Sequence, residues 1–545
     1  MEAGKQQQRE NMVSGTAWLS LANVLSRFLG AAYIIPWYAW MAPFSNQANA
    51  LFSMGYNVYA LFLLLSTIGI PVAIAKEVAH YTALGQEATA YRLVRQILLF
   101  MMGLGVIAAL VMYFAAPALA AASGGGTALT PVMRSLALSI LIFPAMSVIR
   151  GLFQGLSEMR VFALSQIYEQ IIRIIWMLVA TYWIMQLGNK NWEEAVTQST
   201  TAAFYGMLAS LAILFYFLIR YGFLTKLVRP SLASSEVSDL QSMTLLRRTI
   251  TAAVPFMITG SAIQVFKLID QLSFATIMHW VTNYSDTQLS IFFSYFSANT
   301  DKITMILIGT ALTLGDVGLP LITAAYAKNK KREVAYLISY NLQFFAAFML
   351  PAVIGVVLLA RPIYVLFYGT VNSLQLWLFI FAAFQSILLT LLSLAWLFLQ
   401  AMHYSRTAIK HFGWTLAVKF ILQIPMIAAF QSYGPLIATS IAFLFGCYIT
   451  LSKIRRVSHF SPKKTWRGIF GIALLTLLMA IVVVFFNLIF ALIFRGRLTH
   501  LTSLIIVLIS GGTGLYTYLF LSAKLGFLEK FLGLRGTTLR RRLHI

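Results

Sequence analysis

The sequence predicts an all-α, polytopic membrane protein with about fourteen transmembrane helices. Hydrophobic residues make up 60% of the 545 residues and charged residues only 10%, a balance far from that of soluble globular domains. Long apolar runs recur along the whole chain, and polar or Pro/Gly-marked breaks separate them. The single cysteine, Cys447, lies in one of these runs, so neither an intrachain disulfide nor a Cys-based metal site is expected.

The individual spans follow from the thickness of a bilayer, whose core of about 30 Å needs about 20 apolar residues per helix. Division at the breaks predicts spans at residues 12–41, 51–80, 91–115, 131–153, 161–187, 195–221, 249–280, 298–327, 334–359, 373–401, 407–430, 435–453, 467–494 and 500–523.

Basic residues fall on alternate connections between these spans. They begin with Lys5 and Arg9 before the first span and end with Arg540, Arg541 and Arg542 after the last. By the positive-inside rule these connections, and with them both termini, are cytoplasmic. The net charge of +24 is then explained by membrane orientation, so nucleic acid is not an expected partner.

Two groups of six spans show a weak internal repeat. STIGIPVAIA in the second span resembles TLGDVGLPLITA in the eighth, and GLFQGLSEMR resembles LFLQAMHYSR at nearly the same spacing. Chance explains either match alone, since apolar helices share a small alphabet, but two matches at one spacing favour duplication. The predicted parts are an N-lobe at 1–221, a cytoplasmic linker at 222–248, a C-lobe at 249–453, and two further spans with a basic tail at 454–545.

Ionisable residues occur deep inside several apolar spans, where a charge costs about 2.5 to 3.5 kcal/mol. They are Arg27, Glu169, Arg173, Lys267, Asp270 and Lys419. We expect them to face an internal aqueous cavity. Pairing within each helix is the alternative, because Glu169 with Arg173 and Lys267 with Asp270 have i,i+4 and i,i+3 spacing. Arg27 and Lys419 have no acidic residue nearby in sequence, so pairing within helices would leave about two positive charges uncompensated. A pyrophosphate group fits that charge.

Four more residues are expected to line the same cavity: Ser26, Lys76, Glu77 and Arg150. Lys76, Glu77 and Arg150 lie nearer the cytoplasmic ends of their helices. Side chains there can also reach the lipid headgroups, which explains these charges equally well without a cavity.

Prolines interrupt four of the predicted spans: Pro36, Pro71, Pro255 and Pro320. A bend that faced lipid would leave backbone groups without hydrogen-bond partners, so these positions should lie against other helices or the cavity. We predict hinges there, and kinks that serve packing alone are the alternative.

Enzymatic motifs do not appear in the sequence, which has no HExxH, CxxC or Gly-rich phosphate loop, so no catalytic residue, metal or cofactor is expected. A membrane-embedded glycosyltransferase would need an acid on the outer face, where Glu193, Glu194 and Asp286 are the main candidates. A drug or cation antiporter would need an acid-dominated cavity, whereas the deep charges here are positive in sum.

Three stretches resemble the polysaccharide-export branch of the MATE-like (MOP) flippase superfamily. They are SRFLG, YNVYALFLLLSTIGIPVAIAKEVAHYTALG and RGLFQGLSEMRVFALSQIYEQIIRI. Within that branch the lipid II flippases of Firmicutes and their sporulation paralogue are most similar. The resemblance implies two six-helix lobes around a cavity open to one side at a time, with the last two spans flanking a groove for a polyprenyl tail.

The same resemblance assigns roles to individual residues. The family's first-helix cation matches Arg27, and its EQxxR pattern matches Glu169, Gln170 and Arg173. Some lipid II flippases resemble one another in an acidic sodium site near the seventh and eleventh spans. Here the eleventh span carries Lys419 and no acid, so the resemblance does not extend to sodium coupling.

These observations predict a flippase that moves lipid II, an undecaprenyl-diphosphate-linked peptidoglycan precursor, from the inner to the outer leaflet by alternating access. A teichoic-acid or polysaccharide repeat unit, which shares the polyprenyl-phosphate end, is the alternative. The predicted substrate-binding residues are Arg27, Arg173, Lys267, Lys419, Glu169, Asp270 and Gln170. We expect a monomer in the cell membrane, in contact with membrane lipids and the cell-wall synthesis machinery.

Overall fold

The computed structural model describes residues 26, 29–30, 32–67, 70–228, 251, 254–316, 318–496 and 498–532. Every regular element among these residues is a helix and none is a strand, so the all-α prediction is confirmed. Ten helical segments in this part of the chain are long and apolar enough to cross a membrane. The protein is therefore a multi-pass membrane protein.

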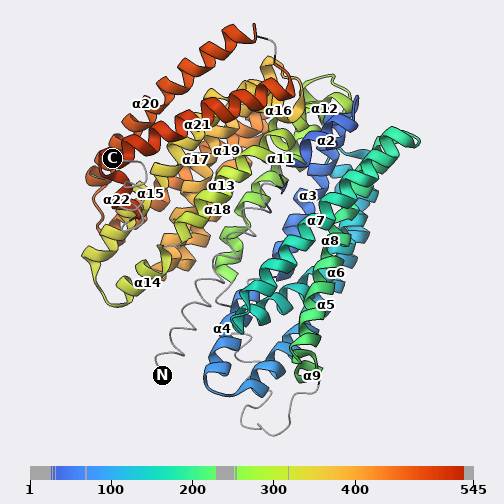
Figure 1. Cartoon of the computed structure of the whole chain (residues 1–545), viewed down its shortest axis with the longest axis vertical. Helices are drawn as coiled ribbons and strands as arrows, with labels where there is room; N and C mark the ends of the chain where they lie inside the picture. The colour runs from blue at the N-terminus through green and yellow to red at the C-terminus, as the bar shows by residue number, and fades with distance from the viewer. Residues whose placement is uncertain are drawn as a thin grey trace. The chain divides into compact units, whose positions relative to one another are not determined.

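The chain forms two compact units, of which the first extends to Ser294. Its described helices are α2 (Ile34–Trp40), α3 (Ser45–Thr67), α4 (Ile70–Ala83), α5 (Glu87–Ala122), α6 (Gly126–Gly155), α7 (Met159–Tyr182), α8 (Trp192–Arg220), α9 (Phe223–Val228), α11 (Ala262–Val281) and α12 (Asp286–Phe293). Consecutive long helices pack as neighbours, α5 on α6 and α7 on α8, while α6 also contacts α3, α4 and α8. Within this unit α4 and α9 lie at one end and α2 and α12 at the other (Figure 1).

The second unit begins at Tyr295. Its described helices are α13 (Asn299–Asp316), α14 (Leu319–Ala327), α15 (Lys331–Leu358), α16 (Ala360–Tyr368), α17 (Ser373–Ala401), α18 (Ser405–Phe430), α19 (Gly434–Ser458), α20 (Pro462–Ile493), α21 (His500–Lys524) and α22 (Phe527–Leu532). The last two long helices, α20 and α21, pack on each other and on α15 and α16 (Figure 1). The two predicted C-terminal spans are thus part of this unit.

The predicted spans 407–430 and 435–453 lie within one apolar stretch, Ser405–Ser458. They are nevertheless two helices. Gln431 has a φ of 49° and begins a short 3₁₀ helix that ends at Tyr433, so the chain reverses and α18 packs against α19. The other predicted spans coincide with long helices, except that 51–80 is divided between α3 and α4 and that 12–41, 249–280 and 298–327 contain shorter helices in their described parts.

Matching breaks divide the second and eighth predicted spans. α3 ends at Thr67 and α4 begins at Ile70, while α13 ends at Asp316 and α14 begins at Leu319. Pro71 and Pro320 are each the second residue of the helix that follows the break, where proline removes no intrahelical hydrogen bond. The repeated position of the break agrees with the predicted duplication.

The other two predicted hinges also lie near helix boundaries. Pro36 is in the first turn of α2, and Pro255 lies in helical residues 254–260, which a turn at Ser261 separates from α11. All four prolines are therefore close to interruptions of helices. Movement about them stays a prediction.

The division into units differs from the predicted lobes, because α11 and α12 belong to the first unit and not to a unit that starts near residue 249. Gln271 on α11, which is buried, explains this grouping. Its Nε2 donates to the Met54 carbonyl at 3.1 Å and to Ser123 Oγ at 2.9 Å, and its Oε1 accepts from Asn57 Nδ2 at 3.0 Å. These contacts join α11 to α3 and to the end of α5. The boundary between the two copies of the predicted repeat reflects the ancestry of the sequence and not the packing of the helices, so it stays a prediction.

We predict that Gln271→Leu lowers the free energy of unfolding by about 1–3 kcal/mol, because it leaves buried polar groups on Asn57 and Ser123 without this partner. Thermal unfolding of the purified protein measures the loss. Gln264→Leu is the matched control on the same helix, since Gln264 Oε1 is buried without a hydrogen-bond partner in the described structure. An equal loss in both variants would show that Gln271 does not join these helices.

Candidate functional site

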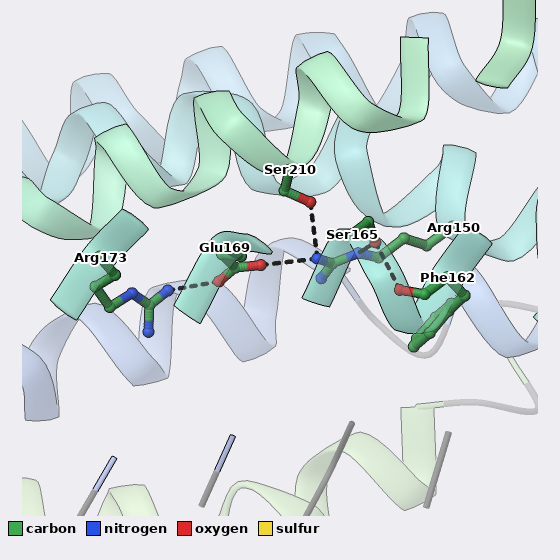
Figure 2. A network of polar contacts seen from close by, with 6 residues as sticks. All are labelled: Arg150, Phe162, Ser165, Glu169, Arg173 and Ser210. Atoms are coloured by element: carbon green, nitrogen blue, oxygen red, sulfur yellow. Dashed lines mark hydrogen bonds and ion pairs between the residues drawn. The ribbon is translucent and has the colours of Figure 1, made fainter. Parts of the chain in front are cut away.

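The centre of the candidate site is Glu169, a buried carboxylate on α7 that contacts two arginines. Its Oε2 accepts from Arg150 Nη2 at 2.8 Å, and its Oε1 accepts from Arg173 Nη2 at 2.5 Å. Figure 2 shows Glu169 between the two guanidinium groups. Two arginines and one carboxylate leave this cluster with one net positive charge inside an apolar helix bundle.

Hydroxyl groups from two helices complete the surroundings of Arg150. Arg150 Nε donates to Ser165 Oγ at 3.0 Å, and Arg150 Nη2 also donates to Ser210 Oγ at 2.8 Å (Figure 2). The guanidinium carbon lies 5.6 Å from the centre of the Phe162 ring, within range of a cation–π contact. Arg150 is thus fixed by α7 and α8 as well as by its carboxylate partner.

The geometry of α7 explains how these side chains meet. Ser165, Glu169 and Arg173 follow one another at intervals of four residues, so they share one face of the helix. Gly206 lets α8 approach that face, because a Cβ atom there would lie 2.7 Å from the Glu169 carbonyl oxygen and 3.1 Å from Arg173 Cβ. Ser210 lies one turn further along α8 and reaches Arg150 as a result.

The structure argues against the headgroup alternative for Arg150, and its place at a cavity stays a prediction. Arg150 does not extend toward headgroups, because only 9% of the residue is exposed and it pairs with Glu169. The pair predicted from the i,i+4 spacing is therefore part of a group of three charges. Arg173 is the more accessible arginine, with 21% of its side chain exposed against 11% for Arg150.

Sequence reasoning missed Phe162, Ser165, Ser210 and Gly206. Ser165 could have been found, since it stands one helical turn before Glu169 in the same pattern that drew attention to Arg173. Ser210 and Gly206 lie on another helix, so no local spacing connects them with Glu169.

Lys419 also lies in surroundings other than those expected. It is completely buried in the hairpin of α18 and α19, and its Nζ donates to the Pro435 carbonyl at 3.0 Å and to Thr439 Oγ1 at 2.5 Å. The expected exposure to an aqueous cavity is therefore wrong for this residue in the structure. Its part in substrate binding stays a prediction.

The remaining predicted residues lie in varied surroundings. Gln170 Nε2 donates to the Ser26 carbonyl at 3.3 Å, which connects α7 to the first predicted span. Lys76 is exposed, and Glu77 is partly buried.

Lys267 and Asp270, on α11, are both partly buried. Arg27 lies outside the described residues. The roles of all three in substrate binding stay predictions.

The second unit contains an apolar cavity of about 550 Å³. It is lined mainly by α15, α20 and α21, and Phe344, Gly355, Met479, Gly511 and Tyr518 contribute to its wall. Tyr518 Oη donates to the Ala347 carbonyl at 2.7 Å, so the hydroxyl group of this side chain already has a hydrogen-bond partner. The other residues that line the cavity are almost all apolar. Its size is within the common range for ligand pockets.

A second cavity, of about 540 Å³, lies in the first unit and contains two of the candidate acids for glycosyl transfer. Glu193 and Asp286 both line it, together with Trp192 and His279. Asp286 Oδ1 contacts His279 Nε2 at 2.9 Å, and this pair joins the end of α11 to the start of α12. The contact thus has a structural explanation at the connection between the two helices.

Comparison with known proteins gives the class to which this arrangement belongs. The chain belongs to the family described as polysaccharide biosynthesis protein, which matches residues 12–284. Among solved structures it is similar to a lipid II flippase MurJ in an inward closed conformation, with a TM-score of 0.63, 14% identity and coverage of 93% of this chain and 99% of that one. An inward-facing multidrug resistance MATE family transporter of the MOP superfamily gives a TM-score of 0.60 at 14% identity, over 79% of this chain and 96% of that one. These matches support the predicted fold.

Two relatives from Bacillus subtilis (strain 168) are similar in sequence. Lipid II flippase MurJ is 29% identical over 538 residues, which are 96% of this chain and 97% of the relative. Stage V sporulation protein B is 29% identical over 215 residues, which are 38% of this chain and 39% of the relative. The resemblance predicted from the motifs is confirmed at the level of the superfamily.

We predict that Glu169→Gln destabilises the protein more than Arg173→Met does. The first change leaves one buried and one partly buried guanidinium group without a carboxylate, for a loss of about 3–5 kcal/mol. The second keeps the contact between Arg150 and Glu169 and should remove about 1.5–3 kcal/mol. Thermal unfolding of the purified variants measures both losses.

The double variant tests the same cluster. Glu169→Gln with Arg173→Met restores the original net charge, so it should be more stable than Glu169→Gln alone. Strictly additive losses would mean that the three charges do not act as one group.

Proposed function

We propose that this protein is a flippase for a polyprenyl-diphosphate-linked glycan, and that its substrate is lipid II. The observation that carries the proposal is the buried cluster with one net positive charge around Glu169. Charges inside membrane proteins are rare and mark pathways for substrates or ions. The similarity to lipid II flippase MurJ along nearly the whole chain supports the same assignment.

The cluster suggests how a diphosphate is bound and released. Arg150 is held by Ser165 and Ser210 as well as by Glu169, whereas Arg173 is held by Glu169 and is more exposed. A diphosphate would therefore replace Glu169 at Arg173, while Arg150 keeps the carboxylate charge compensated. When the diphosphate is released, Glu169 pairs with Arg173 again, which lowers the free energy of the protein without substrate.

The apolar cavity of the second unit fits the other end of such a substrate. A polyprenyl tail has no polar group, and the walls of this cavity are apolar along α15, α20 and α21. We propose that the tail lies there and that both termini of the protein are cytoplasmic, as the distribution of basic residues predicts. In this proposal the protein acts as a monomeric transporter and not as an enzyme, next to the cell-wall synthesis machinery.

A second candidate substrate is the repeat unit of a teichoic acid or another polysaccharide. The description of the matched family, polysaccharide biosynthesis protein, favours it. Both substrates end in polyprenyl phosphate groups, so the cluster and the cavity fit either one.

Complementation separates the two substrates. Expression of this protein in a bacterium depleted of its own lipid II flippase should restore growth and cell shape. Restoration of capsule or teichoic-acid export, without restoration of growth after flippase depletion, would favour the second substrate.

We predict that Arg173→Ala abolishes complementation although the protein still folds with reduced stability, because Arg150 still compensates Glu169. Arg173→Lys should be nearly as damaging if the guanidinium binds two phosphate oxygens at once, since an ammonium cannot do so. Arg220→Ala, at an exposed arginine at the end of α8, is the control. Full activity of Arg173→Ala would exclude this arginine from the pathway.

We also predict that Gly355→Leu reduces transport by filling the apolar cavity. A Cβ atom at Gly355 would meet no atom within 4 Å, and leucine has a higher helix propensity than glycine, so the fold should tolerate the change. Gly512→Leu is the matched control, because Gly512 has the same free space but is not part of the cavity wall. Flipping of a labelled lipid in proteoliposomes measures the difference, and equal rates in both variants would exclude the cavity as the place of the tail.

A further inference from the structure

The apolar cavity of the second unit is elongated along the helices that form it. Its wall on α15 and on the C-cap residue of that helix extends from Phe344 to Leu359, which corresponds to about 22 Å of helix. This is most of the hydrocarbon thickness of a bilayer, about 30 Å. Phe527 on α22 lines it too, and Ser522 near the end of α21 contributes a hydroxyl group. Given cytoplasmic termini, Phe344 and Phe527 mark the cytoplasmic end of the cavity.

A polar contact stands directly beyond this end. Gln343, the residue before Phe344, is buried and accepts a hydrogen bond through its Oε1 from Lys530 Nζ at 2.6 Å. Its Nε2 donates to the carbonyl oxygen of Lys464 at 3.4 Å. Gln343 therefore joins α22 to the start of α20 and brings two lysines to the same end of the cavity.

Close packing fixes this arrangement. A Cβ atom at Gly468 on α20 would lie 2.5 Å from Gln343 Cδ, and one at Gly471 would lie 2.9 Å from Cζ of Phe527. The two glycines let α20 approach both the polar contact and the aromatic end of the cavity. The side chains of Lys464 and Lys530 are exposed, so they are accessible to a ligand at the surface.

We infer that Lys464 and Lys530 form a capture site for the diphosphate of a polyprenyl-linked substrate whose tail occupies the apolar cavity. The inference rests on the proposed function and adds a binding step on the cytoplasmic side, separate from the cluster around Glu169. An apolar cavity with the Lys530 ammonium and the backbone of Lys464 just beyond one end matches an amphiphile with an anionic head. Lysine binds phosphate groups as a compact point charge.

The charge around the site favours a diphosphate over a phosphodiester headgroup. Lys463 and Arg467 lie close to Lys464 in the first turns of α20, and Glu529 is the acid adjacent to Lys530. The balance of these side chains is strongly positive, so a head with more than one negative charge gains more than a singly charged phospholipid does. Each lysine near an anionic membrane surface increases the affinity for that surface about fivefold, and we expect a similar contribution to the binding of a diphosphate head.

Binding of three lipids to the purified full-length protein tests the inference: undecaprenyl diphosphate, undecaprenol and phosphatidylglycerol. Native mass spectrometry or competition with a labelled lipid gives the affinities. Lys464→Gln with Lys530→Gln should lower the affinity for undecaprenyl diphosphate by about twenty-five-fold and leave that for undecaprenol unchanged. Glutamine at position 530 keeps a donor for Gln343, and Lys464 contacts Gln343 through its backbone, so the local fold should be kept.

Lys524→Gln is the matched control, because Lys524 is exposed at the end of α21 and takes no part in the hydrogen bonds of Gln343 that bring Lys464 and Lys530 together. It should bind all three lipids as the unmodified protein does. An unchanged affinity of the double variant for undecaprenyl diphosphate would overturn the inference. Phosphatidylglycerol that competes as well as the diphosphate would also overturn it, because the site would then hold a resident phospholipid.

Complementation by the unmodified protein distinguishes this inference from the proposed function. If the unmodified protein restores growth after flippase depletion and the double variant binds undecaprenyl diphosphate normally, the function stands and the capture site fails. If the unmodified protein does not restore growth, the lipid II assignment fails, while a selective loss of diphosphate binding in the double variant still supports the capture site.

Discussion

The contact of one carboxylate with two guanidinium groups is the constraint on which the first unit depends. Glu169 compensates Arg150 and Arg173 in surroundings where an unpaired charge is costly. Three helices contribute to this compensation, since Arg150 stands on α6, Glu169 on α7 and Ser210 on α8. The close approach of α7 and α8 at Gly206 is part of the same arrangement. Packing and charge are therefore linked, and a substrate that takes Arg173 from Glu169 acts on the contact that holds the helices together.

The two units carry complementary chemistry. The first holds a positively charged cluster, and the second holds an apolar cavity with lysines at one end. A lipid-linked glycan has a charged diphosphate and a long apolar tail, so each of its parts has a counterpart in the protein. Helix breaks before Pro71 and Pro320 occur at matching places in the two halves of the sequence. Such breaks are where segments of a long helix can change direction with little loss of hydrogen bonds.

Several features of the fold followed from local sequence because their causes are local. Apolar runs of membrane length predicted the long helices, and Pro71 and Pro320 predicted the breaks in the second and eighth spans, whereas Pro144, Pro351 and Pro425 lie inside unbroken helices. The i,i+4 spacing predicted the contact of Glu169 with Arg173, since one helix turn brings the two side chains together. In the same way the motifs were sufficient to predict a resemblance to polysaccharide-export proteins and lipid II flippases, which the family match and the similarity to lipid II flippase MurJ bear out.

The sequence by itself determined that this chain is an all-α membrane protein with charges where lipid cannot compensate them. Only the tertiary structure decided which groups compensate those charges. Arg150 pairs with Glu169 across two helices, Lys419 is enclosed by α19, and Gln271 joins α11 to the first unit. Each of these contacts joins different helices, and the order of residues along one helix gives no information on which face of another helix it will meet. The periodicity of a sequence determines which side chains share one face of a helix, whereas tertiary packing determines which other helix that face contacts.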